Sequence, residues 1–137
     1  ARIRAYCRET GQTVPEDPGA IVRLALEALA LKYRYILDAL EDLFERRLER
    51  IHIVGGGIQN QLLCQFTADA TQRLVVAGPV EATAIGNLMV QALGLGEVGS
   101  LDEARQVVRT SFAPAYYAPA PDQNWDAAYE RLCTRLA

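Results

Sequence analysis

Apolar residues recur at three- and four-residue steps through residues 22–44, and charged residues occupy the opposite side of the same periodicity. This pattern is typical of an amphipathic helix. Asp17 is a suitable N-cap and Pro18 suits the first helical position, so we expect a helix over about 19–47. Additional apolar residues widen the apolar face of this helix, so that a single neighbouring element cannot cover it. We therefore expect the helix to lie between a sheet and another helix.

Two short runs rich in β-branched residues, 50–54 and 74–77, are each followed by glycine. The first is followed by Gly55–Gly57 and the second by Gly78–Pro79, which is typical of strands that end in turns. A helical pattern over residues 60–71 joins them. A strand, a helix and a second strand predict a parallel βαβ unit with a right-handed crossover. Because a pair of strands is only marginally stable, we expect further strands in preceding sequence.

The rest of the chain has helical patterns separated by one proline-rich segment. A third helix is expected to begin near Val80 and to end at Gly94 and Gly96. A fourth starts at Leu101, and a last one covers about 125–136. The prolines within residues 112–121 predict an extended segment without regular structure. Together these elements predict a helix-rich α/β fold that contains a short parallel βαβ unit.

The 137 residues are 50% hydrophobic and 23% charged, which is in the range of one soluble globular domain. No apolar run approaches the ~18 residues of a membrane-spanning helix and no signal peptide is visible, so we expect a cytosolic protein without a membrane partner. A net charge of −3 gives no electrostatic footprint for nucleic acid. The chain starts without methionine, and Ile3, Tyr6 and Cys7 are spaced like a buried helix face. We therefore expect most of one domain of a longer protein.

A single lysine, Lys32, and a single histidine, His52, exclude several catalytic classes. Lys32 is not part of a Gly-Lys-Ser/Thr phosphate loop, and one histidine cannot form a two-histidine metalloprotease site. Neither serine lies in a GxSxG hydrolase motif. The cysteines fit neither a CxxC metal motif nor a disulfide framework, and we expect reduced thiols at Cys7, Cys64 and Cys133.

The glycine triplet Gly55–Gly57 lies between a predicted strand and a predicted helix, where a ligand can approach the backbone without interference from a Cβ. Free amides at the start of the following helix favour a phosphate, and Asn60 is placed to hydrogen-bond a purine or a ribose. Ligands of open α/β sheets bind at this carboxyl edge. The spacing is not that of the GxGxxG dinucleotide motif. Two interpretations stay open, a nucleotide site and a tight turn without a ligand.

Five other residues have a plain structural interpretation beside a functional one. His52 alternates with two isoleucines, which favours a packed, hydrogen-bonded histidine over a ligand. Asp69 is expected to satisfy backbone amides or face solvent, and Glu81 to complement a helix dipole rather than act as a general base. Gly86 within a helix costs ~1 kcal/mol relative to alanine, and close packing is favoured there over a nearby ligand. Cys64 has no neighbouring cation in the sequence and is expected to be a small core residue.

Tyr116, Tyr117 and Trp125 could form an aromatic platform for a sugar or a base. Such residues more often anchor a returning segment on the surface of a domain, and we favour that interpretation. If part of the sheet is missing, apolar faces of the long helix stay exposed, which predicts self-association of the chain.

Two segments resemble the C-terminal domain of the FGGY carbohydrate kinases. They are IHIVGGGIQNQLLCQFTADA at residues 51–70 and AGPVEATAIGN at residues 77–87, and YCRET at residues 6–10 adds to the likeness. The family pattern is a glycine pair, a glutamine, an Ala-Asp pair, and a proline followed by a helix-start glutamate and a glycine. In this chain these elements are Gly55-Gly56, Gln65, Ala68-Asp69, Pro79, Glu81 and Gly86. The similarity extends over essentially the whole chain and thins after about Val98.

The resemblance implies a ribonuclease H-like, actin-like ATPase fold in which two domains close on a cleft. It implies ATP and Mg²⁺ as cofactors, with the nucleotide beside the glycine pair. Carried over residue by residue, Gly56 is the main backbone contact, Asn60 contacts the adenine side, and Gly55 and Gly57 shape the loop. The catalytic aspartate, the phosphate-binding loop and most sugar contacts of the family lie in preceding sequence. The resemblance therefore implies a C-terminal nucleotide-binding domain over residues 1–137, with no catalytic residue and no metal ligand of its own.

The implied activity belongs to a full-length cytosolic kinase that phosphorylates a ketose with ATP. The strings GGGIQNQLL and GPVEATAIGN resemble the branch of the family that acts on L-rhamnulose. This resemblance implies phosphorylation of L-rhamnulose at its primary 1-hydroxyl in rhamnose catabolism. Fuculose or xylulose is the alternative sugar. An alternative outside the enzymes is an interaction module that keeps the glycine turn for structure only. The implied partners are ATP, a ketose and the missing N-terminal domain, and this chain alone is expected to be inactive.

Overall fold

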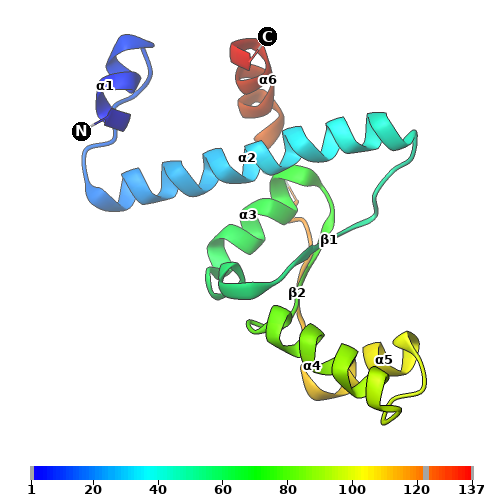
Figure 1. Ribbon diagram of the computed structural model, residues 1–137. Helices are drawn as coiled ribbons and strands as arrows, with labels where there is room; N and C mark the ends of the chain where they lie inside the picture. Colours follow the sequence, from blue (N-terminus) through cyan, green and yellow to red (C-terminus); the bar gives the residue numbers. More distant parts are fainter. Residues whose placement is uncertain (1, 122–123, 137) are drawn as a thin grey trace.

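The computed structural model describes residues 2–121 and 124–136 (Figure 1). The first half of the described chain contains α1 (Arg2–Glu9), α2 (Pro18–Phe44), β1 (Arg50–Ile53), the 3-10 helix η1 (Gly55–Gln59) and α3 (Gln61–Thr71). The second half contains β2 (Leu74–Ala77), α4 (Ala82–Leu95), α5 (Leu101–Ser111), β3 (Ala115–Tyr117) and α6 (Trp125–Leu136). The predicted order of helices and strands is confirmed, and η1 and β3 are additional to it.

The three strands form one sheet in the order β1-β2-β3. β1 and β2 are parallel, with His52 opposite Val76, and α3 joins them, so the predicted βαβ unit is confirmed. β3 is antiparallel to β2, and the expectation of no regular structure over residues 112–121 is wrong. Pro114 and Pro119 flank this strand of 3 residues without lying in it, so their missing N–H groups do not interrupt its pairing with β2.

The long helix α2 begins as predicted and ends earlier. Asp17 is its N-cap, and the carboxylate accepts a hydrogen bond from the Ala20 N–H at 2.8 Å. The helix stops at Phe44 rather than near Arg47 because Glu45 adopts a left-handed conformation with a φ of 51°. The expectation that α2 lies between a sheet and a helix is wrong. α2 packs on α3 and α6, and α3 lies between α2 and the strands (Figure 1).

The core consists of two clusters on opposite sides of α3. The cluster between α2, α3 and α6 contains Ala30, Phe66, Ala70 and Trp125. The cluster between α3 and the sheet contains Cys64, Ala68, Val75 and Ala77. Phe66 and Trp125 pack edge to face with their ring centroids 5.4 Å apart, a favoured aromatic geometry. Because α3 is buried from both sides, it holds the sheet and the outer helices together.

Among the described residues, α3 covers one face of the sheet. Ile51 and Ile53 pack toward α3, and side chains alternate along a strand, so Arg50 and His52 lie on the opposite face. α4 and α5 pack on each other and extend away from α2 at the far end of β2 (Figure 1). The face of the sheet opposite α3 is therefore open toward α4 and α5.

The start of α4 differs from the prediction, and its end agrees with it. The helix begins at Ala82 rather than near Val80, and it continues through Gly94 to the predicted stop at Gly96. It ends at Gly96, whose φ of 78° is left-handed and whose N–H donates to the Ala92 carbonyl. In the described part of the chain, no helix is both long enough and apolar enough to cross a membrane.

Candidate functional site

The glycine triplet and the turn after β2 lie next to each other at the carboxyl ends of the parallel strands. The Gly78 N–H donates to the Ile53 carbonyl at 2.8 Å, and the Gly55 N–H donates to the Pro79 carbonyl at 3.2 Å. These two bonds fix one turn against the other. Gly55 has a φ of 77°, a conformation that favours glycine, so the shape of the loop itself requires this residue.

Gly56 and Gly57 are exposed, and neither has a positive φ. A Cβ on Gly56 would meet no atom within 4 Å, and a Cβ on Gly57 would meet only the Ile53 side chain, at an ordinary 3.6 Å. The packing of the described chain therefore requires neither glycine. Open space lies above Gly56, where a ligand can approach the backbone closely.

Asn60 lies beside this loop as the N-cap of α3. Its Oδ1 accepts a hydrogen bond from the Leu63 N–H at 3.0 Å, which satisfies one of the free amides at the helix start. The side chain is exposed, and no described residue accepts a hydrogen bond from its Nδ2. Asn60 therefore caps α3 and still presents a donor beside the glycine loop.

The expected packing of His52 and Gly86 is wrong. His52 is exposed on the open face of the sheet, because Ile51 and Ile53 point toward α3 and the alternation leaves His52 on the other side. A Cβ on Gly86 would meet no atom within 4 Å, so close packing within the described chain does not explain this glycine. Both residues line one groove on the open face.

Asp69 and Cys64 have the structural roles predicted for them, and Glu81 lies at the predicted helix start. Asp69 is 2% exposed, and its Oδ1 accepts hydrogen bonds from Gln65 Nε2 and the Ala120 N–H, both at 2.8 Å. Cys64 is fully buried, and burial raises the pKa of its thiol, which disfavours the reactive thiolate. Glu81 is exposed at the N-cap of α4, where its side chain makes no capping hydrogen bond.

The aromatic residues near the C-terminus do not form one platform. Trp125 is buried against Phe66, and Tyr117 packs against the cluster between α3 and the sheet. Both anchor the C-terminal part of the chain, as the favoured interpretation predicted. Tyr116 points the other way, is 64% exposed and lines the groove on the open face.

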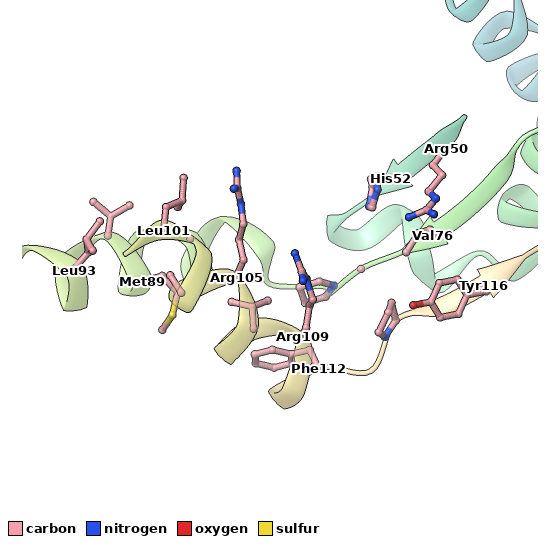
Figure 2. Close-up of a pocket in the computed structure, with 17 residues that line it drawn as sticks. Arg50, His52, Val76, Met89, Leu93, Leu101, Arg105, Arg109, Phe112 and Tyr116 are labelled. Atoms are coloured by element: carbon pink, nitrogen blue, oxygen red, sulfur yellow. The ribbon is translucent and has the colours of Figure 1, made fainter. Parts of the chain in front are cut away.

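This groove has a volume of about 870 Å³ and lies between the open sheet face, α4 and α5. Figure 2 shows Arg50 and His52 on the sheet side and Arg105 and Arg109 on α5. This group is not visible in the sequence, because the four side chains come together only through the fold. The one local signal is the spacing of Arg105 and Arg109, which places them on the same side of a helix.

The described residues contain no group of three or more His, Cys, Asp or Glu side chains that could hold a metal ion. Residues 55–60 include no carboxylate, so the glycine loop offers Mg²⁺ no ionised ligand of its own. It does fit part of a nucleotide, because the open backbone at Gly56 and the Asn60 amide need no cation to contact a ribose or a base.

Residues 1–95 match the family described as "FGGY family of carbohydrate kinases, C-terminal domain". This match covers more than half of the chain. The chain belongs to the FGGY family of carbohydrate kinases. The identification made from the motifs at residues 51–70 and 77–87 is thus confirmed.

Two curated relatives of this FGGY chain are rhamnulokinases. The protein of Bacteroides thetaiotaomicron is 51% identical over 127 residues, which are 93% of this chain and 26% of the relative. The protein of Halalkalibacterium halodurans is 45% identical over 118 residues, which are 86% of this chain and 25% of the relative. The chain thus spans about a quarter of the length of the curated relatives it matches.

A solved FGGY kinase also has a similar fold. The crystal structure of a xylulose kinase from Rhodospirillum rubrum superposes with a TM-score of 0.66 and 26% identity, covering 91% of this chain and 25% of that chain. This likeness confirms the expected fold, part of a ribonuclease H-like, actin-like ATPase domain. The ligand contacts assigned to Gly55, Gly56, Gly57 and Asn60 stay predictions.

Proposed function

We propose that residues 1–137 form the C-terminal nucleotide-binding domain of a rhamnulokinase whose N-terminal domain lies outside this chain. The full-length enzyme binds ATP between its two domains and transfers a phosphoryl group to the 1-hydroxyl of L-rhamnulose. It acts in the cytoplasm, in rhamnose metabolism. The identities of 51% and 45% to proteins named rhamnulokinase support this proposal.

The open space above Gly56 supports the nucleotide part of the proposal. Neither a left-handed conformation nor a close contact within the described chain requires glycine there. A ligand that lies against the backbone would explain why residue 56 is a glycine. In this arrangement Gly56 contacts the nucleotide, the left-handed Gly55 keeps the loop in shape, and the Asn60 Nδ2 donates to the adenine side.

The chemical step depends on groups from the rest of the enzyme. In phosphoryl transfer, Mg²⁺ bridges and neutralises the phosphates, and a carboxylate accepts the proton of the attacking hydroxyl. The resemblance to the family implies that the base and the ligands of Mg²⁺ lie in the N-terminal part, and we assign them there. The residues of this chain bind and orient the nucleotide.

Gly56→Val in the full-length enzyme tests the nucleotide site. The valine side chain enters the space where the nucleotide is proposed to lie, without meeting another part of this chain. We expect the KM for ATP to rise by about tenfold or more, equivalent to ~1.4 kcal/mol, with the KM for the sugar little changed.

Gly94→Val is the matched control. A Cβ there also meets no atom within 4 Å, and the residue lies in α4 outside the loop. We expect ATP kinetics close to wild type for this variant. Unchanged ATP kinetics in Gly56→Val would instead favour a glycine turn that serves structure only, as in an interaction module.

The identity of the sugar needs a separate measurement. The xylulose kinase with a similar fold makes xylulose the specific alternative within the family. We expect kcat/KM of the full-length enzyme, measured by ADP release, to be highest for L-rhamnulose among L-rhamnulose, fuculose and xylulose. A preference for xylulose or fuculose would support the proposed kinase activity but contradict the proposed substrate L-rhamnulose.

A further inference from the structure

The groove on the open face of the sheet has an apolar and aromatic lining. His52, Val76 and Tyr116 are cross-strand neighbours and form one row across the three strands. From the other side, α4 and α5 contribute apolar side chains, Met89 and Val108 among them. Because Tyr116 is 64% exposed, the groove offers an aromatic ring for stacking.

Four basic side chains surround this lining, and none of the described residues that line the groove is acidic. Arg50 and His52 lie on β1, and Arg105 and Arg109 lie on α5 across from them (Figure 2). Arg105 Nη1 donates to the exposed Asp102 carboxylate at 3.0 Å. Arg50 and Arg109 form no ion pair with any described residue. The groove therefore concentrates positive charge in a chain whose net charge is −3.

The size and the charge of the groove together indicate the class of ligand. A volume of about 870 Å³ lies in the range of small-molecule sites, roughly 300–1,000 Å³. Guanidinium groups match phosphate oxygens with two parallel N–H donors. A small inorganic anion would contact the guanidinium groups but not the apolar lining or Tyr116. A ligand with a phosphate at one end and a ring at the other would contact both.

We propose that this groove binds a phosphate ester of a sugar or of a nucleoside, at a site that adjoins the glycine loop but is lined by none of Gly55–Gly57. Arg105 and Arg109 hold the phosphate, Arg50 adds a third guanidinium, and the ring of the ligand stacks on Tyr116. Gly78 and Pro79, which lie next to the glycine loop, line the end of the groove nearest to it. Gly86 adds room on the α4 side, because a Cβ there meets no atom within 4 Å.

Arginine footprinting of the full-length protein tests the proposal. Phenylglyoxal modifies accessible guanidinium groups, and mass spectrometry reports the rate for each arginine. The probes are ADP, L-rhamnulose 1-phosphate and inorganic phosphate, and Arg131, exposed on α6 outside the groove, is the internal control. At about ten times the Kd of a bound ester, modification of Arg105 and Arg109 should slow about tenfold, with Arg131 unchanged.

The probe that protects these arginines identifies the source of the phosphate ester. Protection by ADP indicates a nucleotide, and protection by L-rhamnulose 1-phosphate indicates a sugar phosphate. Unchanged rates with both esters would overturn the proposal. Equal protection by inorganic phosphate at the same concentration would overturn it too, because the ring would then contribute nothing.

Variants separate this site from the proposed ATP site. The double variant R105Q/R109Q should abolish the protection of Arg50, and R131Q should preserve it. Gly56→Val should keep the protection of Arg105 and Arg109, since it changes only the glycine loop. Footprinting needs no turnover, so a protein without kinase activity still gives a result for the groove. Continued protection of Arg50 in R105Q/R109Q would contradict the proposal.

Discussion

The guanidinium group of Arg73 contacts both carboxylate oxygens of Glu41, with Nη2 2.9 Å from Oε1 and 2.9 Å from Oε2. Arg73 Nε donates to the Leu48 carbonyl at 2.8 Å, and the Leu48 N–H donates to Glu41 Oε1 at 2.8 Å. The side chains of Arg73 and Glu41 are only 11% and 19% exposed. These contacts join the end of α2, the connection to β1 and the residue before β2, so they position the start of both parallel strands.

Glu41→Gln should lower the free energy of unfolding of this chain by about 1–2 kcal/mol. The glutamine keeps an acceptor, but Arg73 keeps its desolvation cost and loses its counter-ion, and partial exposure moderates the effect. Glu49→Gln is the matched control, because the pair of Glu49 with Arg47 is exposed at 3.7 Å and should contribute about 0–0.5 kcal/mol. Urea unfolding followed by circular dichroism measures both, and equal losses would contradict the role given to Glu41.

The same carboxylate predicts a pH dependence. The hydrogen bond from the Leu48 N–H, followed by Arg73, holds the pKa of Glu41 below its ordinary value of 4.5, although desolvation opposes the shift. Because the folded pKa lies below the unfolded one, ionised Glu41 stabilises the fold above about pH 4.5. This contribution is lost as the pH falls from there through the folded pKa. The stability difference between wild type and Glu41→Gln should therefore shrink in that window, and a constant difference between about pH 7 and pH 3 would count against the prediction.

Asp69 and Gln65 of α3 form hydrogen bonds with residues 118–120, which follow β3. Asp69 Oδ1 accepts from the Ala120 N–H, and Gln65 Nε2 donates to the neighbouring Ala118 carbonyl at 2.8 Å. Asp69→Ala removes the acceptor and should cost about 2 kcal/mol of unfolding free energy, while Asp69→Asn keeps one oxygen and should cost less. Hydrogen exchange provides the local measurement. The Ala120 amide should exchange faster in Asp69→Ala than in Asp69→Asn, and equal rates would refute this role of Asp69.

The fold could be predicted from the sequence where local patterns decide it. The β-branched runs followed by glycine gave both parallel strands, and the Asp17-Pro18 pair gave the start of α2. β3 was missed because Pro114 and Pro119 suggested a segment without pairing, although both lie outside the paired residues. The partners of α2 were also missed, since periodicity shows how wide an apolar face is and not which element covers it.

One part of the candidate site could be predicted from the sequence, and the other part could not. The glycine triplet was visible because glycine between a strand and a helix is a local signal, and its open space at Gly56 is consistent with the proposed ligand contact. The groove was not visible, because Arg50 and Arg109 are brought to one surface by the sheet and by the turn between α4 and α5. His52 was misplaced for a related reason: alternation with isoleucine shows that one face of the strand is buried and says nothing of the other.

This chain without the rest of the enzyme should show no L-rhamnulose-dependent release of ADP in a coupled assay. Its described residues include the glycine loop but no cluster able to hold a metal, and the proposed base lies outside the chain. A nucleotide held by one wall of a cleft keeps much of its surface in water, so calorimetry should also detect no ATP binding with a Kd in the range of about 1–100 μM. The full-length enzyme under the same conditions is the control. Turnover by the chain alone would refute both the domain assignment and the placement of the base, whereas tight ATP binding without turnover would refute only the shared cleft.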